Sequence, residues 1–437
     1  GMSAVARLLL AHGDVTGSDT GRWPLSEALI PAGVTVHDTF DARHVEGSDV
    51  VVRSSAYKED NAEVAAALAA GIPVWKRQDA WRFLAKGKRV VAVAGTHGKT
   101  TTTAMTWTAL RGAGIDASLI CGAALADTGT NAHAGTSDVL VIEADEYDRA
   151  FHALEPEVAV VTNLDHDHVD LFPTLEDYRE AFRVFVAGIP RGGTLVACAD
   201  DAGAAALADE ARRSLAGRSV RTYGTSARAD IRVRVPEPGR IELEHEAQRI
   251  GIGLKAPGEH NARNAAAAVA AAMAIGAVFR PAAVGLLSFL GTSRRLELLG
   301  ESGGVTVIDD YAHHPVEIRA SIAAVRRSGS RVVAVFQPHT ASRLGAFFDE
   351  FADALRLADR VVIAETFASA RGDVDARDSA HKLADRAGGS YARDPDEAAH
   401  ALAALAHAGD TVLVLGAGDI RAAGERLLEL LRETAPA

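Results

Sequence analysis

Residues 89–111 constrain the fold of this chain more than any other stretch. The run Arg89-Val-Val-Ala-Val-Ala94 is apolar and rich in β-branched side chains, which predicts a buried strand. A glycine turn, Gly-Lys-Thr and a predicted helix at 102–111 follow it directly. In such an arrangement, backbone N–H groups and the helix N-terminus surround phosphate oxygens. The stretch therefore predicts a phosphate-binding loop.

This loop suggests a role for each polar residue in it. Lys99 is expected to reach the β- and γ-phosphates of a nucleotide, and the Thr100 hydroxyl is expected to hold Mg²⁺. The other residues expected at the nucleotide are Gly95, Thr96, His97, Gly98 and Thr101. The usual pattern has a further glycine near Ala92 or Val93, so this is a shortened form, and an ordinary glycine turn is the alternative interpretation.

Length and charge limit the classes of protein to consider. A chain of 437 residues should hold about three domains. The net charge of −12 argues against nucleic acid or an anionic membrane as the main partner. Cys121 and Cys198 offer neither a disulfide framework nor a metal spacing, which suits the cytoplasm. The most apolar segment, 265–279, is shorter than the ~20 residues that span a bilayer, so we predict a buried helix and no membrane insertion.

Strands and helices alternate along the chain, which indicates parallel, doubly wound sheets. We predict an α/β protein with a Rossmann-like domain at 1–87, a central P-loop ATPase domain with a parallel sheet at 88–293, and a C-terminal Rossmann-like domain at 294–437. The strands expected in the first and last domains are 14–19, 33–37, 49–55, 72–75, 305–308, 331–336, 360–364 and 411–415.

The N-terminal domain lacks its expected opening. A domain of this type ordinarily starts with a strand and a glycine-rich turn for a diphosphate, whereas this sequence starts with a predicted helix at 2–12. We therefore expect the first strand to be missing. Gly1 is either the last glycine of such a turn or a residue ahead of a mis-assigned start methionine.

Polar clusters follow the strands of the central domain. The strand at 137–142 runs into Glu143-Ala-Asp-Glu-Tyr-Asp148, and the strand at 158–163 runs into Leu164-Asp-His-Asp-His-Val-Asp170. Since α/β sheets bind ligands at the carboxyl ends of their strands, both clusters are candidate site segments.

Several motifs together resemble the Mur ligase family. They are Gly95-Thr-His-Gly-Lys-Thr-Thr-Thr102, 143–148, 163–170, Gly258-Glu-His-Asn-Ala-Arg-Asn264, Asp309-Asp-Tyr-Ala-His-His-Pro315 and Phe336-Gln-Pro-His339. They run in the family's order over nearly the whole chain. The resemblance implies an ATP-dependent ligase that joins a carboxylate to an amine through an acyl phosphate. Its implied branch joins L-alanine to UDP-N-acetylmuramate in peptidoglycan precursor synthesis.

The resemblance also implies the catalytic residues, which are Lys99, Glu143 and His168. Thr100, Glu143 and His168 would ligate Mg²⁺, with Mn²⁺ as an alternative. Histidine is an unusual ligand for so hard a cation, so the role of His168 rests on the resemblance. The alternatives are a solvated strand-end carboxylate for Glu143 and a hydrogen-bonded core imidazole for His168.

Four further residues would bind the nucleotide by resemblance. Asn261 and Asn264 would face the adenine, and their spacing places them on one helix face. Arg295 would neutralise phosphate and Asp310 would accept ribose hydroxyls. The alternatives are helix capping for an asparagine and an interdomain ion pair for Arg295 or Asp310.

The substrate residues are also implied by resemblance. Tyr311, His313, His339 and Arg343 would face L-alanine, since an arginine fork suits a carboxylate. Thr340 and Ala341 depart from the arginine and aromatic that many relatives have there, and a surface turn is the alternative for His313 and His314. The candidates for the UDP-sugar are Ser18, Asp19, Ser54, Ser55, His97 and Asn131.

Two observations bear on the choice of branch. No lysine lies between Lys99 and Lys255, where several Mur ligases have a carbamylated lysine, and the alanine-adding branch matches that absence. A ligase that attaches a recycled tripeptide to UDP-N-acetylmuramate is a close alternative. A nucleotide-binding protein without ligase activity is a more distant one. We expect a monomer or a weak homodimer.

Overall fold

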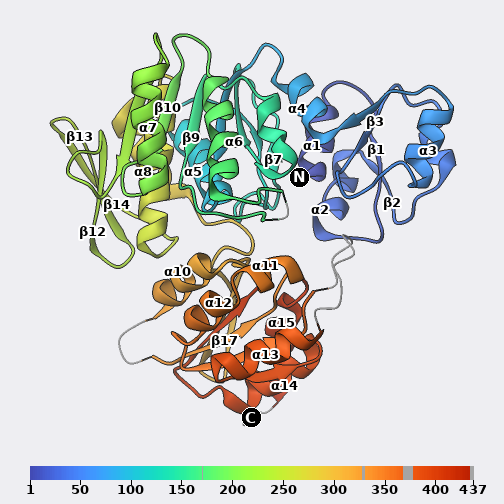
Figure 1. Ribbon diagram of the computed structural model, residues 1–437, viewed down its shortest axis with the longest axis vertical. Helices are drawn as coiled ribbons and strands as arrows, with labels where there is room; N and C mark the ends of the chain where they lie inside the picture. Colours follow the sequence, from blue (N-terminus) through green and yellow to red (C-terminus); the bar gives the residue numbers. More distant parts are fainter. Residues whose placement is uncertain (170, 327–329, 368–376, 434–437) are drawn as a thin grey trace. The chain divides into compact units, whose positions relative to one another are not determined.

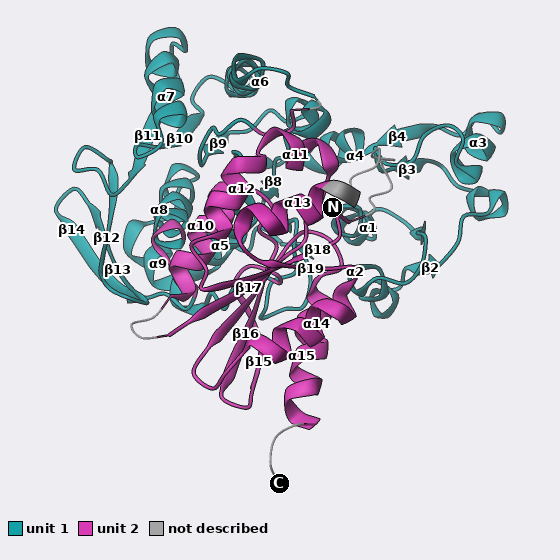
Figure 2. Ribbon diagram, turned by 60° about the horizontal axis from the view of Figure 1, so that its bottom comes forward, with its two compact units in different colours: residues 1–166, 171–255, 261–292 teal, residues 167–170, 256–260, 293–437 magenta. Residues whose placement is uncertain are grey.

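The computed structural model describes residues 1–169, 171–326, 330–367 and 377–433. They divide into two compact units (Figure 2). Unit 1 comprises 1–166, 171–255 and 261–292, and unit 2 comprises 167–170, 256–260 and 293–437. Each unit is an α/β structure with a parallel core, which confirms the predicted fold class.

The N-terminal part of unit 1 contains four short strands in two parallel pairs. The strands are β1 (Thr16–Ser18), β2 (Thr35–His37), β3 (Val51–Arg53) and β4 (Val74–Lys76). β1 pairs with β2 and β3 pairs with β4, but no described strand joins the two pairs into one sheet. The predicted strands exist, but each is only three residues long and they do not form the single sheet that the alternation implied. The helices of this part are α1 (Met2–Leu9), α2 (Pro24–Glu27), α3 (Ala62–Ala69) and α4 (Arg77–Ala85), with 3-10 turns η1 (Ile30–Ala32) and η2 (Ala42–Val45).

A ten-stranded sheet forms the rest of unit 1 (Figure 1). Its order is β14-β13-β12-β11-β10-β9-β5-β8-β6-β7. The predicted strand β5 (Arg89–Ala94) lies at its centre between β8 (Val139–Glu143) and β9 (Val158–Val161), parallel to both. The other strands are β6 (Ser118–Ile120), β7 (Ala132–His133), β10 (Thr194–Cys198), β11 (Ser219–Gly224), β12 (Ile231–Glu237), β13 (Arg240–His245) and β14 (Gln248–Gly253).

The helices around this sheet include the one predicted after the phosphate loop. That helix, α5, starts at Lys99 and ends at Gly112, and residues 100–110 are buried throughout. The buried helix predicted at 265–279 is α8, which starts at Glu259 and ends at Ala274, before the predicted limit. Eight of its alanines have 0% exposure: Ala262, Ala265, Ala266, Ala267, Ala268, Ala270, Ala271 and Ala272. The remaining elements are η3 (Tyr147–Ala153), α6 (Leu175–Ala187), α7 (Ala202–Ser214), α9 (Phe279–Gly285) and η4 (Leu286–Ser288). No helix within the described ranges is long and apolar enough to cross a bilayer.

The chain extends this sheet with an antiparallel arm that we did not predict. Beyond β11, β13 pairs antiparallel with β12 and with β14, and β14 is the last strand on that side. The two-residue β7 ends the opposite side. The parallel strands between these edges carry the phosphate loop.

Unit 2 contains a six-stranded sheet in the order β15-β16-β20-β17-β18-β19. All four strands predicted for 294–437 are present: β16 (Val305–Asp310), β17 (Val332–Phe336), β18 (Arg360–Ala364) and β20 (Thr411–Leu415). The antiparallel edge strand β15 (Glu297–Ser302) and the short β19 (Ser390–Ala392) were not predicted. The helices are α10 (Pro315–Val325), α11 (Ala341–Ala346), α12 (Phe348–Leu355), α13 (Arg377–Ala387), α14 (Pro395–Leu405) and α15 (Arg421–Glu433).

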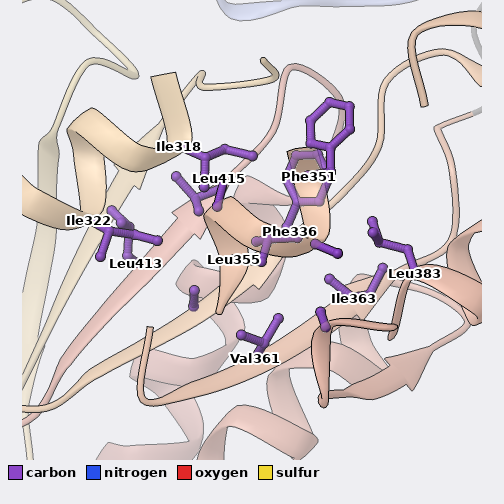
Figure 3. Packing of buried hydrophobic residues seen from close by; sticks show 14 of the residues in the cluster. Ile318, Ile322, Phe336, Phe351, Leu355, Val361, Ile363, Leu383, Leu413 and Leu415 are labelled. Carbon is purple, nitrogen blue, oxygen red and sulfur yellow. The ribbon is translucent and has the colours of Figure 1, made fainter. Parts of the chain in front are cut away.

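The core of unit 2 forms where the helices cover the sheet. Figure 3 shows Phe336 and Leu415 from the strands beside Phe351 and Leu355 from α12. All four side chains are at most 2% exposed. Continuous apolar strands of this type are buried on both faces, which is typical of parallel sheets.

Candidate active site

The phosphate loop has the backbone conformation that its glycines allow. β5 ends at Ala94, and Gly95 and Gly98 have φ of +130° and +81°. A Cβ on Gly95 would lie 2.0 Å from Thr162 Oγ1 and 2.9 Å from the Thr162 nitrogen. Glycine is therefore required at this position both by the left-handed backbone and by the approach of β9.

The carboxyl end of β9 holds the loop in place. Asn163 accepts a hydrogen bond from the His97 nitrogen at 2.8 Å and donates one to the His97 oxygen at 3.0 Å. Thr96 Oγ1 donates to the Asp165 carbonyl at 2.8 Å and accepts from the Asp165 nitrogen at 2.9 Å. No role was predicted for Asn163. Its position at the end of a buried strand, where ligands bind in α/β sheets, could have identified it as a candidate site residue.

Lys99 lies inside the loop and is paired. Its Nζ donates to the carbonyls of Gly95 and Thr96 at 2.6 and 3.1 Å, and to Glu146 Oε1 at 2.9 Å. Burial would lower the pKa of Lys99, but the charges of Glu146, Asp145 and Glu143 and the hydrogen bond to Glu146 together outweigh it, and the pKa is raised. Lys99 is therefore a fixed cation. The side chain of Glu146 has 0% exposure.

Thr100 and Glu143 meet beside Lys99. Thr100 Oγ1 donates to Glu143 Oε1 at 3.1 Å, and the Gly122 nitrogen donates to Glu143 Oε2 at 2.7 Å. A hydroxyl and a carboxylate are the oxygen ligands that Mg²⁺ prefers when phosphates and water complete its coordination. The pair fits such a cation, whereas within the described ranges no group of three or more His, Cys, Asp or Glu side chains could hold a metal by itself.

A substitution at Gly122 should disturb this pair selectively. A Cβ there would lie 2.6 and 2.7 Å from the carboxylate oxygens of Glu143, a flexible side-chain end that can swing away. We expect Gly122→Ala to raise the Mg²⁺ concentration for half-maximal turnover by about tenfold, since one charged ligand contact is weakened. The melting temperature should change little. A metal titration of turnover measures this, and an unchanged midpoint would contradict the assignment of Glu143.

The two predicted adenine residues lie on α8 next to the phosphate loop. Asn261 and Asn264 are buried, and Asn264 Nδ2 donates to Asn261 Oδ1 at 3.1 Å. A Cβ on Gly98 would lie 2.8 Å from Asn264 Oδ1. Asn264 therefore packs against the loop, and its role toward adenine stays a prediction.

The six candidate UDP-sugar residues belong to unit 1, and those with described hydrogen bonds have different partners. Ser18 Oγ lies 3.3 Å from His44 Nδ1, and Asp19 accepts from the Tyr57 hydroxyl at 3.2 Å. Ser54 accepts from the Ala56 nitrogen at 3.3 Å, whereas Ser55 is exposed. Asn131 is buried and donates to the Cys121 carbonyl at 3.3 Å. His97 is the one candidate within the loop itself, 3.6 Å from Asp165.

A contact between α4 and the residues that follow β8 was also not predicted. Arg77 Nη2 lies 2.7 Å from Asp145 Oδ2. Burial would raise the pKa of Asp145, but Arg77 and Lys99 outweigh it and the pKa is lowered. This ion pair connects α4 to the segment that contains Glu143, at the end of β8, and Glu146.

In unit 2, Arg343 faces a protein carboxylate. Its Nε and Nη2 donate to Asp167 at 3.0 and 3.1 Å, and both side chains are at least nine-tenths buried. Burial would raise the pKa of Asp167, but Arg343 holds it well below its usual range. The fork that we expected at a substrate carboxylate is thus engaged here by Asp167. The neighbouring His168 has a left-handed φ of +51°.

Tyr311 and the histidines predicted in unit 2 form a chain of ring contacts. The guanidinium carbons of Arg294 and Arg295 lie 5.0 and 5.3 Å from its ring centroid. His313 Nδ1 lies 2.8 Å from the Tyr311 carbonyl, and burial lowers the pKa of His313 to about 3. His314 is 4% exposed, so the alternative of a surface turn is wrong. The ring of His339 lies 6.0 Å from that of His313 and stacks on Phe367.

Arg295 has a partner within its own unit. Its Nη1 lies 3.8 Å from Glu317 Oε1. Both residues belong to unit 2, so this contact is not the interdomain ion pair given above as the alternative. Asp310, also predicted at the nucleotide, accepts from the nitrogens of Leu296 and Ala312 at 2.9 and 2.8 Å. Burial raises its pKa to about 6.

This raised pKa makes stability depend on pH. Between the usual pKa of 3.8 and about 6, folded Asp310 keeps a proton that the unfolded chain has lost, so stability falls as pH rises. The loss amounts to about 3 kcal/mol above pH 6. An amide nitrogen cannot accept a backbone N–H, so we expect Asp310→Asn to lose one of these two hydrogen bonds and to melt below wild type near pH 4, with the difference becoming smaller or reversing above pH 6. Thermal denaturation across this range measures it, and a constant difference would contradict the assignment.

Comparison with known protein families decides the relationship. The model of the Mur ligase middle domain matches residues 93–272. The model of the Mur ligase family catalytic domain matches 1–89, and that of the Mur ligase glutamate ligase domain matches 294–418. The chain belongs to the Mur ligase family. The resemblance stated from the motifs is thereby confirmed.

Curated relatives of this Mur ligase cover its whole length. The UDP-N-acetylmuramate–L-alanine ligase of Arthrobacter sp. (strain FB24) is 44% identical over 441 residues, which are 100% of this chain and 94% of the relative. The protein of that name from Kineococcus radiotolerans is 44% identical over 450 residues, covering 99% and 94%.

Solved structures give the same result for the fold. A UDP-N-acetylmuramate–alanine ligase from Thermotoga maritima superposes with a TM-score of 0.82 at 27% identity, over 99% of this chain and 97% of that one. A murein peptide ligase from Psychrobacter arcticus superposes with a TM-score of 0.75 at 26% identity, over 100% and 97%. The Mur ligase fold therefore extends over both units.

Proposed function

We propose that this Mur ligase joins L-alanine to the carboxylate of UDP-N-acetylmuramate, with conversion of ATP to ADP and phosphate, in peptidoglycan precursor synthesis. The observation that carries the proposal is 44% identity over the full chain to ligases of that name. The phosphate loop with its paired Lys99 and the Thr100–Glu143 pair supply the matching chemistry.

The first step of the reaction must activate the carboxylate. A carboxylate is a poor electrophile, so its oxygen must first take the γ-phosphoryl group of ATP, which gives an acyl phosphate that an amine can attack. Positioning and charge neutralisation account for most of the catalysis of such a transfer. Lys99 and the loop N–H groups would neutralise the transferring phosphate, and the glycines let the backbone approach it.

Thr100 and Glu143 would hold a divalent cation, for which we propose Mg²⁺. Bound there, the cation supplies positive charge beside the β- and γ-phosphates. Glu143 is kept in place by the Gly122 nitrogen at 2.7 Å, so the carboxylate is oriented before a ligand arrives. His168 as a further ligand stays a prediction.

The amine side of the reaction belongs to unit 2. His313 is neutral at physiological pH because its pKa is lowered to about 3, so it would accept or donate a hydrogen bond without adding charge. Tyr311, His339 and Arg343 stay predicted contacts of L-alanine. Both cysteines are free thiols, which suits a reducing compartment, so we propose that the reaction takes place in the cytoplasm, with a monomer or weak homodimer as the acting species.

ADP release tests the proposal directly. The full chain is incubated with ATP, Mg²⁺ and UDP-N-acetylmuramate, with each of a panel of amino acids or with the tripeptide. We expect release to depend on the UDP-sugar and to be fastest with L-alanine. Preference for the tripeptide would assign the recycling reaction instead, and ADP release that ignores both acceptors would refute a ligase.

A further inference from the structure

The ammonium group of Lys99 has its hydrogen-bonding capacity filled by the protein. It carries three N–H donors, and three acceptors lie within reach: the Gly95 carbonyl at 2.6 Å, the Thr96 carbonyl at 3.1 Å and Glu146 Oε1 at 2.9 Å. A phosphate oxygen can therefore bind Lys99 only by replacing one of them. Of the three, Glu146 alone carries a charge.

Glu146 is built into unit 1 from several sides. Its side chain has 0% exposure, and the Tyr178 hydroxyl of α6 donates to the same Oε1 at 3.3 Å. Tyr178 is itself buried, and its hydroxyl lies 3.0 Å from Thr96 Oγ1. A buried carboxylate is costly unless it is paired, so Lys99 and Glu146 stabilise each other as long as no other anion reaches the lysine.

We propose that Glu146 is a positioning residue that competes with the nucleotide polyphosphate for Lys99. The carboxylate holds the ammonium in the loop and yields it when a β- or γ-phosphate arrives. The inference rests on the proposed function, because it requires a nucleoside polyphosphate at this loop. It goes beyond that function because it states that Glu146 lowers the affinity of the protein for nucleoside polyphosphates.

Two physical consequences follow from such competition. A phosphate that enters must break an ion pair and come close to a buried negative charge, so the native protein binds polyphosphates less tightly than its loop would allow. A nucleoside monophosphate ends before the reach of Lys99, and its binding should not depend on Glu146. If Glu146 had only a structural role, its replacement would damage the loop and weaken the binding of every nucleotide, including the monophosphate.

The test measures nucleotide affinity by isothermal titration calorimetry of the full chain with ADP and with AMP, in Mg²⁺ and without acceptor substrates. Glu146→Gln removes the charge and keeps the size of the side chain. We expect ADP to bind about tenfold more tightly, as befits the loss of one charged competing contact, and AMP to bind as in wild type. Unchanged or weaker ADP binding overturns the proposal, and so does equal tightening of AMP.

Tyr178→Phe provides the matched variant and the decisive one if Glu146→Gln does not fold. It removes the phenol oxygen but keeps the ring that packs against Phe172 and Phe182. With one donor fewer, Glu146 depends more on Lys99, so ADP should bind about two- to threefold more weakly with AMP unchanged. Unchanged or tighter ADP binding contradicts the proposal. Failure of the wild type to bind ADP at all would instead refute the proposed function.

Discussion

Lys99→Ala should abolish ADP release that depends on both UDP-N-acetylmuramate and L-alanine. We expect kcat/KM to fall by at least about 10³-fold, because a preorganised charge at the transferring phosphate is removed from a water-excluded site. The variant should fold with a lower melting temperature, because the buried Glu146 loses the cation that pairs with it. The carbonyls of Gly95 and Thr96 lose their donor, but Asn163 continues to hold the loop through His97.

The matched control for this variant is Lys255→Ala. Lys255 is an exposed lysine of the same unit, and its substitution makes the same change in net charge. Its turnover should equal that of wild type. Activity of Lys99→Ala close to that of the control would show that this lysine takes no part in phosphoryl transfer, and the assignment of the loop would then be wrong.

Gly95→Ala should eliminate nucleotide binding and also lower stability. The left-handed backbone at φ +130° costs an L-residue about 1–2 kcal/mol. The contacts of the new Cβ with Thr162, one of them to backbone, add about 1–3 kcal/mol of overpacking. Relief requires β9 and the loop to separate, which moves the N–H groups that face the phosphates. Calorimetry with ADP and thermal denaturation measure the two effects.

Gly114→Ala separates the two causes. Gly114 has φ of +81°, but a Cβ there would meet nothing within 4 Å. It should lower the melting temperature modestly and leave ADP affinity unchanged. If Gly95→Ala behaved in the same way as this control, the close approach of β9 would have no influence on the loop.

The sequence predicted those elements whose signal is local. β5 and the four predicted strands of unit 2 are apolar runs rich in β-branched residues, and the helix after the loop was predicted, although it starts at Lys99 and not at 102. The arm of β12 and β13 was missed although its signal was present. Ile231-Arg-Val-Arg-Val235 alternates with period two, and Pro238-Gly239 marks the turn.

Contacts between distant segments could not be predicted from the sequence. Glu146 and Tyr178 are 32 positions apart, and they meet beside the phosphate loop because β8 and β9 flank β5 in the sheet. The same applies to Asp167 and Arg343, which are 176 positions apart. Residue type suggested a carboxylate partner for Arg343, but only the fold shows that a side chain of the protein supplies it.

The antiparallel arm also determines which strand lies at one margin of the central sheet. Among the described strands β14 is the last on its side of the ten-stranded sheet, and an edge strand is a ready template for pairing with another strand. Arg249 forms ion pairs with Glu242 and Glu244 on the next strand, and Gly251 and Gly253 weaken the strand's own preference for extended pairing. At the opposite margin, a strand of two residues is too short to recruit another chain. Long sheets tend to aggregate at their margins, and here charge, glycine and brevity protect them.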